Sequence, residues 1–241
     1  MKLNTLVKPT YTFAPRSKPY KLCSFDIDNP VLDRLKVSTS PLEEHYNRFI
    51  IEIKNKQNKL LGREIFSMDN ETGNIFGFSI EVEKEYRQKS YRFGEILRLA
   101  SIIEMLENKL STFDIYSKDT AVLFHSKYKF QPHFQTFAER DYALQTIIKN
   151  TFNLPKEFIK QALSIIEKIQ QFPQAETQRN LREESCELTK KYIQQILLSQ
   201  NKPKNNLFDY GMNMQLTVED LKNNSNFFNQ LFEKHNIEYK I

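Results

Sequence analysis

The sequence predicts an α/β protein with a mixed, mostly antiparallel sheet that is flanked by helices. Three apolar runs with a period of two residues, at 48–54, 60–68 and 74–82, are joined by short polar turns, which is typical of an antiparallel meander. From residue 93 onward, apolar residues recur with the period of a helix. After about residue 139, further helical segments dominate the chain.

The segment before the meander is expected to be irregular. Residues 1–20 contain three prolines and many polar groups, and we expect them to form a loop or a loosely docked arm. Residues 41–46 predict the start of a short helix, with Ser40 as its N-cap.

A helix, a strand, a helix and a strand are expected to follow the meander. The apolar spacing predicts a helix from Phe93 to about Lys109. A short strand is expected at 112–116, a short helix at 119–127 and the start of another strand at 130–134. The predicted order is therefore βββαβαβ.

The C-terminal region is expected to hold three helices and two short strands. A helix opening at Leu154-Pro155 has proline early in the helix, where its missing N–H costs little, and a second helix covers about 178–198. Residues 212–216 and 237–241 are strand candidates. Between them, Thr217 and Asp220 resemble a capping box before a last helix that carries Phe228 and Phe232.

Composition excludes several classes of protein. The net charge of +5 over 241 residues is modest, and no arginine stripe or long lysine run is present, so nucleic acid is not expected as a partner. No stretch approaches the roughly 20 apolar residues of a membrane helix. Cys23 and Cys186 form no CxxC pair, and no histidines occur at metal-ligand spacing, so we expect neither a metal site nor a disulfide framework. A cytoplasmic protein is expected.

The segment from Ile80 to Gly94 carries the chemical signal. A predicted strand ends at Val82, a polar and basic loop follows, and a helix begins near Phe93. Such a junction directs free backbone N–H groups and the positive end of the helix dipole toward the space above the loop, which suits a pyrophosphate. The loop adds three cationic side chains, namely Arg87, Lys89 and Arg92.

This segment resembles the acyl-CoA-binding motif of the GNAT superfamily, Val-x-Pro-Glu-Tyr-Arg-Gly-Lys-Gly-x-Gly-x-x-Leu. Residues 82–87 match its first part and residues 94–97 match its last part. The middle departs from the motif, because Gln88, Ser90 and Arg92 stand where glycines are expected. Glycines there allow a close backbone approach to the phosphates and positive φ angles.

A later segment is similar to the second motif of the same family, Asn-x-x-Ala-x-x-Phe-Tyr-x-Lys-x-Gly-Phe. The residues that agree are Ala121, Phe124, Lys127 and Phe130. Lys118, His125 and Lys129 replace the Asn, Tyr and Gly of the motif. One helix and one strand separate the two motifs, as the family requires, and the resemblance covers about residues 45–132.

The resemblance implies an N-acyltransferase that uses acetyl-CoA or another acyl-CoA as co-substrate. The residues expected to bind it are Val82, Arg87, Gln88, Lys89, Ser90, Tyr91, Arg92, Phe93, Gly94, Phe124 and Lys127. A backbone N–H near Val82 is expected to stabilise the oxyanion. His125 holds the position of the family tyrosine that protonates the departing sulfur, and an imidazole has a suitable pKa for this. Glu81 or Glu83 is expected to act as the base through water.

Each of these roles has an alternative. His125 is equally a polar residue at a helix end, and glutamates that alternate with Ile80 and Val82 usually form a solvated strand face. At the level of the whole protein, the acceptor is the amine of a small molecule or of a protein. The alternative is an inactive GNAT-like module for binding or interaction, which the missing glycines and the Tyr-to-His change favour.

We expect two regions, a GNAT-like domain at 1–138 and a helical region at 139–241. If 212–216 or 237–241 pairs with the sheet, the helices are an insertion that caps the acceptor site. Otherwise they form a separate helical subdomain for homodimerisation or for docking of a partner.

Overall fold

The computed structural model describes residues 20–29, 31–42, 47–87, 91–118, 121–149, 155–199, 208 and 211–241. One sheet of eight strands runs through it in the order β1-β2-β3-β4-β5-β6-β8-β7. The strands are β1 (Ser24–Asn29), β2 (Asp33–Pro41), β3 (Arg48–Asn55), β4 (Leu60–Asp69), β5 (Asn74–Val82), β6 (Thr112–Ser117), β7 (Gln131–Pro132) and β8 (Met212–Thr217). Among the pairs, β5 with β6 is parallel and the others are antiparallel, which confirms the predicted mixed, mostly antiparallel sheet.

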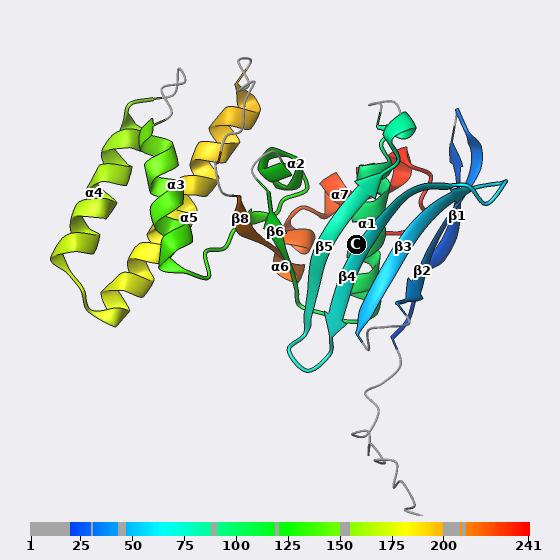
Figure 1. Ribbon diagram of the computed structural model, residues 1–241, viewed down its shortest axis with the longest axis horizontal. Helices are drawn as coiled ribbons and strands as arrows, with labels where there is room; N and C mark the ends of the chain where they lie inside the picture. The colour runs from blue at the N-terminus through cyan, green and yellow to red at the C-terminus, as the bar shows by residue number, and fades with distance from the viewer. Residues whose placement is uncertain are drawn as a thin grey trace, which may run out of the picture.

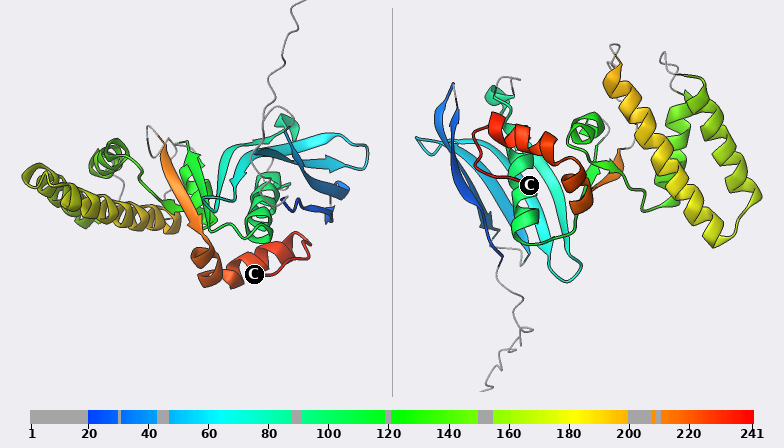
Figure 2. Two further views of the ribbon diagram at one scale, coloured as in Figure 1. Left: turned by 90° about the horizontal axis from the view of Figure 1, so that it is seen from below. Right: turned by 180° about the vertical axis from the view of Figure 1, so that it is seen from behind.

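Seven helices accompany the sheet in the described ranges. They are α1 (Phe93–Glu107), α2 (Val122–Lys127), α3 (Phe137–Lys149), α4 (Glu157–Gln171), α5 (Ala175–Leu198), α6 (Val218–Asn223) and α7 (Ser225–Lys234). Helices α1 and α7 lie on the same side of the sheet, whereas α3, α4 and α5 extend beyond the end formed by β7 and β8 (Figures 1 and 2).

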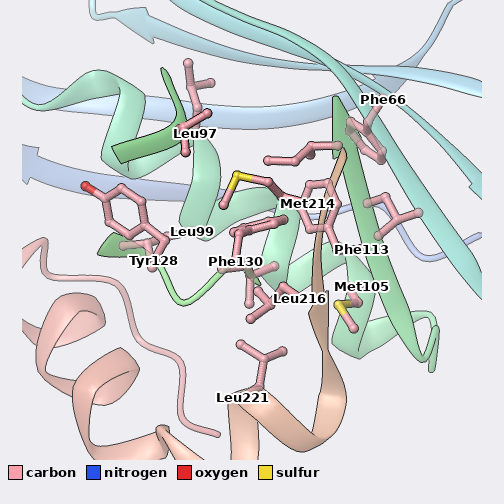
Figure 3. Close-up of a cluster of buried hydrophobic side chains, with 14 of the residues drawn as sticks. Phe66, Leu97, Leu99, Met105, Phe113, Tyr128, Phe130, Met214, Leu216 and Leu221 are labelled. Atoms are coloured by element: carbon pink, nitrogen blue, oxygen red, sulfur yellow. The ribbon is translucent and has the colours of Figure 1, made fainter. Parts of the chain in front are cut away.

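Helix α1 is at the centre of the core. It contacts β3, β4, β5 and β6 on one side, and most of its side chains are buried. Side chains from β4, α1, β6, β8 and α6, among them Phe66, Leu97, Phe113, Leu216 and Leu221, converge in one apolar cluster (Figure 3). The strands that precede α1 and the strand that returns late in the chain therefore share a single core.

The meander and the two motifs fold as predicted. The expected order βββαβαβ is found as β3, β4, β5, α1, β6, α2 and β7, and β5 has the predicted bounds. The hairpin of β1 and β2 was not predicted, because its inward residues Ile27, Leu35 and Val37 are few and are separated by polar residues. Ser40 lies in β2 opposite Ile50, so its prediction as a helix N-cap is wrong. Residues 1–19 and 43–46 lie outside the described residues.

The C-terminal predictions are confirmed in part. The capping box is present, since the Asp220 N–H donates to Thr217 Oγ1 (3.0 Å) and the Thr217 N–H donates to Asp220 Oδ2 (3.0 Å). The predicted last helix is broken at Asn224 into α6 and α7. Residues 237–241 are not a strand. They lie against α7 and α1 instead, where Tyr239 Oη donates to Glu107 Oε1 (3.2 Å).

Helices α3, α4 and α5 lie between two strands of the same sheet. The chain leaves the sheet after β7 and returns as β8, which pairs with both β6 and β7. Helices α4 and α5 were predicted, whereas α3 was not. The division of the chain at residue 138 stays a prediction.

Candidate active site

Strands β5 and β6 part midway along their length. Their parallel pairing joins residues 74–77 to residues 112–115 and stops there, although β5 continues beside β4 to Val82. At the same point β5 has a bulge, because Ile65 lies opposite Ser79 while Phe66 lies opposite Gly77. The extra residue, Phe78, bends the strand away from its neighbour. Along 78–82, β5 therefore has a free edge toward β6.

A cavity of about 470 Å³ opens where the two strands part, and we call it the splay cavity. Its walls come from β5, α1, β6 and the segment around α2. The lining residues are Gly77, Phe78, Ser79, Ile80, Glu81, Gly94, Arg98, Ile115, Tyr116, Lys118, Ala121, Phe124 and His125. The cavity thus brings together four residues that were predicted as functional, namely Glu81, Gly94, Phe124 and His125. No residue of α3, α4 or α5 lines the cavity, so the expected cap over it is not seen among the described residues.

The N-terminus of α1 lies beside this cavity with free backbone donors. The N–H groups of Glu95 and Ile96 donate to the Arg92 carbonyl (2.9 and 3.2 Å). Within the described part of the chain, the N–H groups of Phe93 and Gly94 have no acceptor, and no side chain caps the helix. Two donors and the positive end of a 15-residue helix are therefore available to an anion.

Arg92 adopts the left-handed conformation that glycine adopts without strain. Its φ and ψ are 52° and 31°. In the GNAT motif a glycine is expected at this position. The loop therefore keeps the backbone shape for which glycine is favoured, at the cost of some steric strain.

Aromatic rings hold the loop in front of α1. Tyr91 stacks on Phe93 with ring centroids 5.6 Å apart, and Tyr86 meets Tyr91 edge-on at 5.6 Å. The Phe93 side chain is buried beneath these rings. Arg87 Nε donates to the Val82 carbonyl (2.9 Å), which ties the cationic side chain to the end of β5. Gln88, Lys89 and Ser90 lie outside the described residues.

His125 lies in the wall of the splay cavity and is 8% exposed. Its ring meets Phe124 edge-on at 5.0 Å and Phe130 at 5.8 Å, and its Nδ1 has no hydrogen-bond partner in the described structure. Burial, and then the charge of Arg98, hold the pKa of His125 well below its usual value. The ring is therefore neutral at physiological pH, and it must gain a proton before it can act as an acid.

An ion pair missed by the sequence reasoning lies at the floor of the cavity. Arg98 Nη1 donates to Glu64 Oε1 (2.8 Å), and both side chains are buried. The guanidinium lies between the rings of Phe113 and Phe130, at 4.7 and 5.1 Å from their centroids. Burial raises the pKa of Glu64 to about 7, against the attraction of Arg98. The sequence signal that could have revealed this pair is the position of Arg98 within the apolar stripe of α1.

The two predicted glutamates occupy different surroundings. Glu81 lines the cavity at its rim and accepts from Arg63 Nη2 (2.7 Å) and Nε (2.9 Å). Glu83 is exposed and does not line the cavity, and its backbone N–H donates to the Leu61 carbonyl (3.0 Å). Lys127, predicted to bind the co-substrate, does not line this cavity either. The structure thus brings Glu81 together with His125 and separates Glu83 and Lys127 from them.

Two further properties bear on the class of site. Among the described residues, no three His, Cys, Asp or Glu side chains gather in a way that would hold a metal ion. In the same part of the chain, no helix has both the length and the apolar character needed to cross a membrane. A larger hollow, of about 970 Å³, runs along α7 and residues 236–240, but it is open and contains none of the buried titratable groups.

The sequence matches no family profile and no curated protein. Three of the solved structures that are similar to this chain are acetyltransferases. They are GCN5 from Tetrahymena (13% identity, 38% of this chain and 56% of that chain, TM-score 0.35), spermidine N-acetyltransferase from Vibrio cholerae in complex with CoA and spermine (13%, 36% and 53%, TM-score 0.33), and PaiA N-acetyltransferase from Thermoplasma acidophilum in complex with coenzyme A (13%, 39% and 58%, TM-score 0.32). The chain thus spans between 53% and 58% of the length of these structures.

The arrangement of elements agrees with the fold that the sequence motifs predicted. Strand β5, helix α1, strand β6 and helix α2 follow one another, with the first motif before α1 and the second motif on α2. Residues of both motifs, among them Gly94, Ala121 and His125, meet at one cavity. The order of elements over this part is therefore the one that the resemblance to the GNAT motifs predicts.

Proposed function

We propose that the protein is an N-acyltransferase, which transfers an acyl group from an acyl-CoA to the amine of a small molecule or of a protein. The observation that carries the proposal is the splay cavity beside the N–H groups of Phe93 and Gly94, which have no acceptor among the described residues. Acetyl is the acyl group we favour. When bound, the CoA thioester supplies an activated carbonyl and a thiolate leaving group.

The loop and the helix start are suited to hold the pyrophosphate. The N–H groups of Phe93 and Gly94 are donors without acceptors in the described structure, and Arg92 and Arg87 add positive charge next to them. Backbone donors at a helix N-terminus bind phosphate without requiring glycine, provided that the chain can turn. The left-handed backbone at Arg92 provides that turn.

The free edge of β5 is suited to stabilise the oxyanion. Beyond Gly77 this edge pairs with no strand of the described residues, and Phe78, Ser79 and Ile80 line the cavity at the bulge. We place the oxyanion donor at residues 78–80, closer to the bulge than the position near Val82 that the sequence suggested. An N–H donor in such a role contributes about 3 to 4 kcal/mol to the rate in comparable sites.

We propose that two side chains move the proton. The amine forms a new N–C bond, the C–S bond breaks, and the proton lost by the amine balances the charge on sulfur. Glu81 at the rim is the proposed base through water, and the unpartnered Nδ1 of His125 is the proposed relay toward the sulfur. The neutral imidazole has to take up a proton before it can pass it on, and the lowered pKa of His125 favours the release of the proton over its uptake.

A second candidate function is binding of CoA without turnover. The buried, neutral His125 favours it, since a ring with a strongly lowered pKa is a poor proton acceptor. This candidate function uses the same site as the acyltransferase but transfers no acyl group.

Calorimetric titration of CoA tests the binding step that both candidates share. We expect wild type to bind, and Arg87→Ala/Arg92→Ala to bind at least tenfold more weakly. The control is Arg34→Ala/Arg179→Ala, which removes the same charge from two exposed sites on β2 and α5. Absence of CoA binding by wild type would overturn both candidates, and equal binding by the loop variant would overturn the proposed phosphate site.

Turnover is then measured as thiol release from acetyl-CoA with a library of amines. The acyltransferase proposal predicts release with at least one amine, its loss in His125→Ala and its retention in His125→Tyr, which restores the residue expected from the family motif. Binding of CoA with no thiol release across the library would support the second candidate.

A further inference from the structure

A second cavity of about 470 Å³ lies where the inserted helices meet the sheet. It shares no residue with the splay cavity. Its walls come from the end of α2, from β7, from α5 and from the residue between α6 and α7 (Figure 1). Its lining residues are Ser126, Lys127, Lys129, Phe130, Gln131, Pro132, Lys190, Ile193, Gln194, Leu197, Leu198 and Asn224. We call it the lysine cavity.

The charge of this cavity is positive. Lys127, Lys129 and Lys190 line it, and no aspartate or glutamate does. Lys190 forms a long ion pair with the exposed Glu187, with 3.7 Å between Nζ and Oε1. Lys127 makes no ion pair within the described part of the chain. Lys129 Nζ lies over the ring of Phe227, 4.7 Å from its centroid. Three cations are thus gathered around one hollow that no carboxylate lines.

The nearby carboxylate of Asp220 already accepts hydrogen bonds from other residues. Asp220 accepts from Gln131 Nε2 (2.6 Å) and, through its other oxygen, from the backbone and hydroxyl of Thr217. Asn224 is both the C-cap of α6 and the residue before α7, so the opposite ends of two helix dipoles meet at this wall and the charge of the cavity comes from its lysines. The electrostatic potential in the cavity therefore favours an anion.

The opposite wall is apolar and incompletely covered. It consists of Phe130, Pro132, Ile193, Leu197 and Leu198, and the Leu198 side chain is 79% exposed. Beside this wall, the Oγ of Ser126 is out of contact with solvent and has no hydrogen-bond partner in the described structure. A buried hydroxyl without a partner costs free energy and often marks a place where a ligand or water belongs.

We propose that the lysine cavity binds an amphipathic organic anion, a carboxylate carried on a medium-length apolar chain. The lysines hold the carboxylate, and the leucine and isoleucine side chains of α5 cover the apolar chain. The volume lies within the range of small-molecule sites in proteins. Lys127, which the splay cavity leaves unused, thereby receives a role.

Octanoate is the probe that tests this proposal, and titration calorimetry with the full chain is the measurement. We expect wild type to bind octanoate and to bind the neutral analogue octanol at least tenfold more weakly. Lys127→Gln/Lys190→Gln is expected to bind octanoate at least tenfold more weakly than wild type, with octanol binding unchanged. Raised salt should weaken octanoate binding by wild type, because salt screens the attraction between the lysines of the cavity and the carboxylate.

The matched control is Lys160→Gln/Lys191→Gln, which removes two exposed lysines from α4 and α5 that do not line the cavity. Its octanoate affinity should equal that of wild type. The proposal is overturned if wild type does not bind octanoate, if the cavity variant and the control bind equally well, or if octanol binds as tightly as octanoate. Saturation with CoA should leave octanoate binding unchanged, and displacement would show that the two cavities are not independent sites.

Discussion

Arg98 and Glu64 form an ion pair with a distance of 2.8 Å between Nη1 and Oε1, and both side chains are withdrawn from solvent. The pair connects α1 to β4 directly below the bulge of β5. Gly77, at the start of that bulge, lies close to the guanidinium, since a Cβ added there would be 3.6 Å from Arg98 Nη1. The floor of the candidate site is therefore built around two compensating charges.

Replacing one member of this pair should lower the free energy of unfolding far more than replacing both. Glu64→Leu leaves a buried guanidinium without its carboxylate, and we expect it to lower the free energy of unfolding by about 3 to 5 kcal/mol. Glu64→Leu/Arg98→Met replaces both charges by apolar side chains and should recover most of that loss. Urea unfolding followed by circular dichroism measures both. A double variant as unstable as Glu64→Leu would contradict the prediction.

Glu95 should make stability depend on acid pH. It accepts from Tyr128 Oη (2.6 Å), Lys234 and His235, which joins the start of α1 to the end of α7. Burial alone would raise the pKa of Glu95, but these hydrogen bonds outweigh it and lower the pKa to about 2. Because the unfolded chain binds the proton more tightly, the contribution is complete above about pH 4.5 and is lost as the pH falls toward 2.

Glu95→Gln isolates this effect. The amide keeps the size of the side chain but loses charge-assisted hydrogen bonds, so we expect a loss of about 1.5 to 3 kcal/mol in the free energy of unfolding at neutral pH. The difference between wild type and variant should shrink as the pH falls from 4.5 to 2. Taking the difference cancels the titration of other groups, and a gap that is constant with pH would contradict the assignment.

Arg92 offers a test of the loop backbone. Arg92→Gly removes the steric cost of the left-handed conformation and should raise the free energy of unfolding by about 1 kcal/mol relative to Arg92→Ala. Alanine is the matched control, because it removes the same charge and keeps the strain. Thermal and urea unfolding of the two variants give the comparison, and equal stability would show that residue 92 is not left-handed in solution.

Two glycines at the splay cavity should respond differently to alanine. At Gly77 a Cβ would lie 3.1 Å from atoms of both Ile115 and Phe113, and we expect a loss of about 1 to 3 kcal/mol from overpacking. At Gly94 the nearest atoms, of Phe124 and Ile80, are at 3.7 to 4.0 Å, so Gly94→Ala should fold as well as wild type. Its methyl group enters the cavity wall, and CoA affinity should fall while stability does not.

Sequence periodicity was sufficient where the burial of a segment is simple. Residues 74–82 alternate between the two sides of a sheet, and β5 has those bounds. The helix from Phe93 was predicted because its apolar residues recur with the helical period. Sequence periodicity did not reveal the burial of Glu64 and Arg98, because it treats charged residues as exposed. Each of the two is buried because it pairs with the other across the core.

The site was predicted in its main-chain part and less so in its side chains. The strand, loop and helix around Val82 and Phe93 follow from local sequence. The protonation state of His125 does not, because it depends on burial by Phe124 and Phe130 and on the charge of Arg98. The separation of Lys127 from the cavity likewise depends on how α2 is rotated, which a motif alone does not fix.

The late return of β8 sets the order in which the protein can fold on the ribosome. Thr112 pairs with Thr217, so β6 has no second neighbour until more than a hundred further residues have been synthesised. During that interval the nascent chain presents an open, apolar strand edge in the middle of its future sheet, which is a template for mispairing. Helices α3, α4 and α5 form from local contacts, so they can fold before the last central strand of the sheet is synthesised.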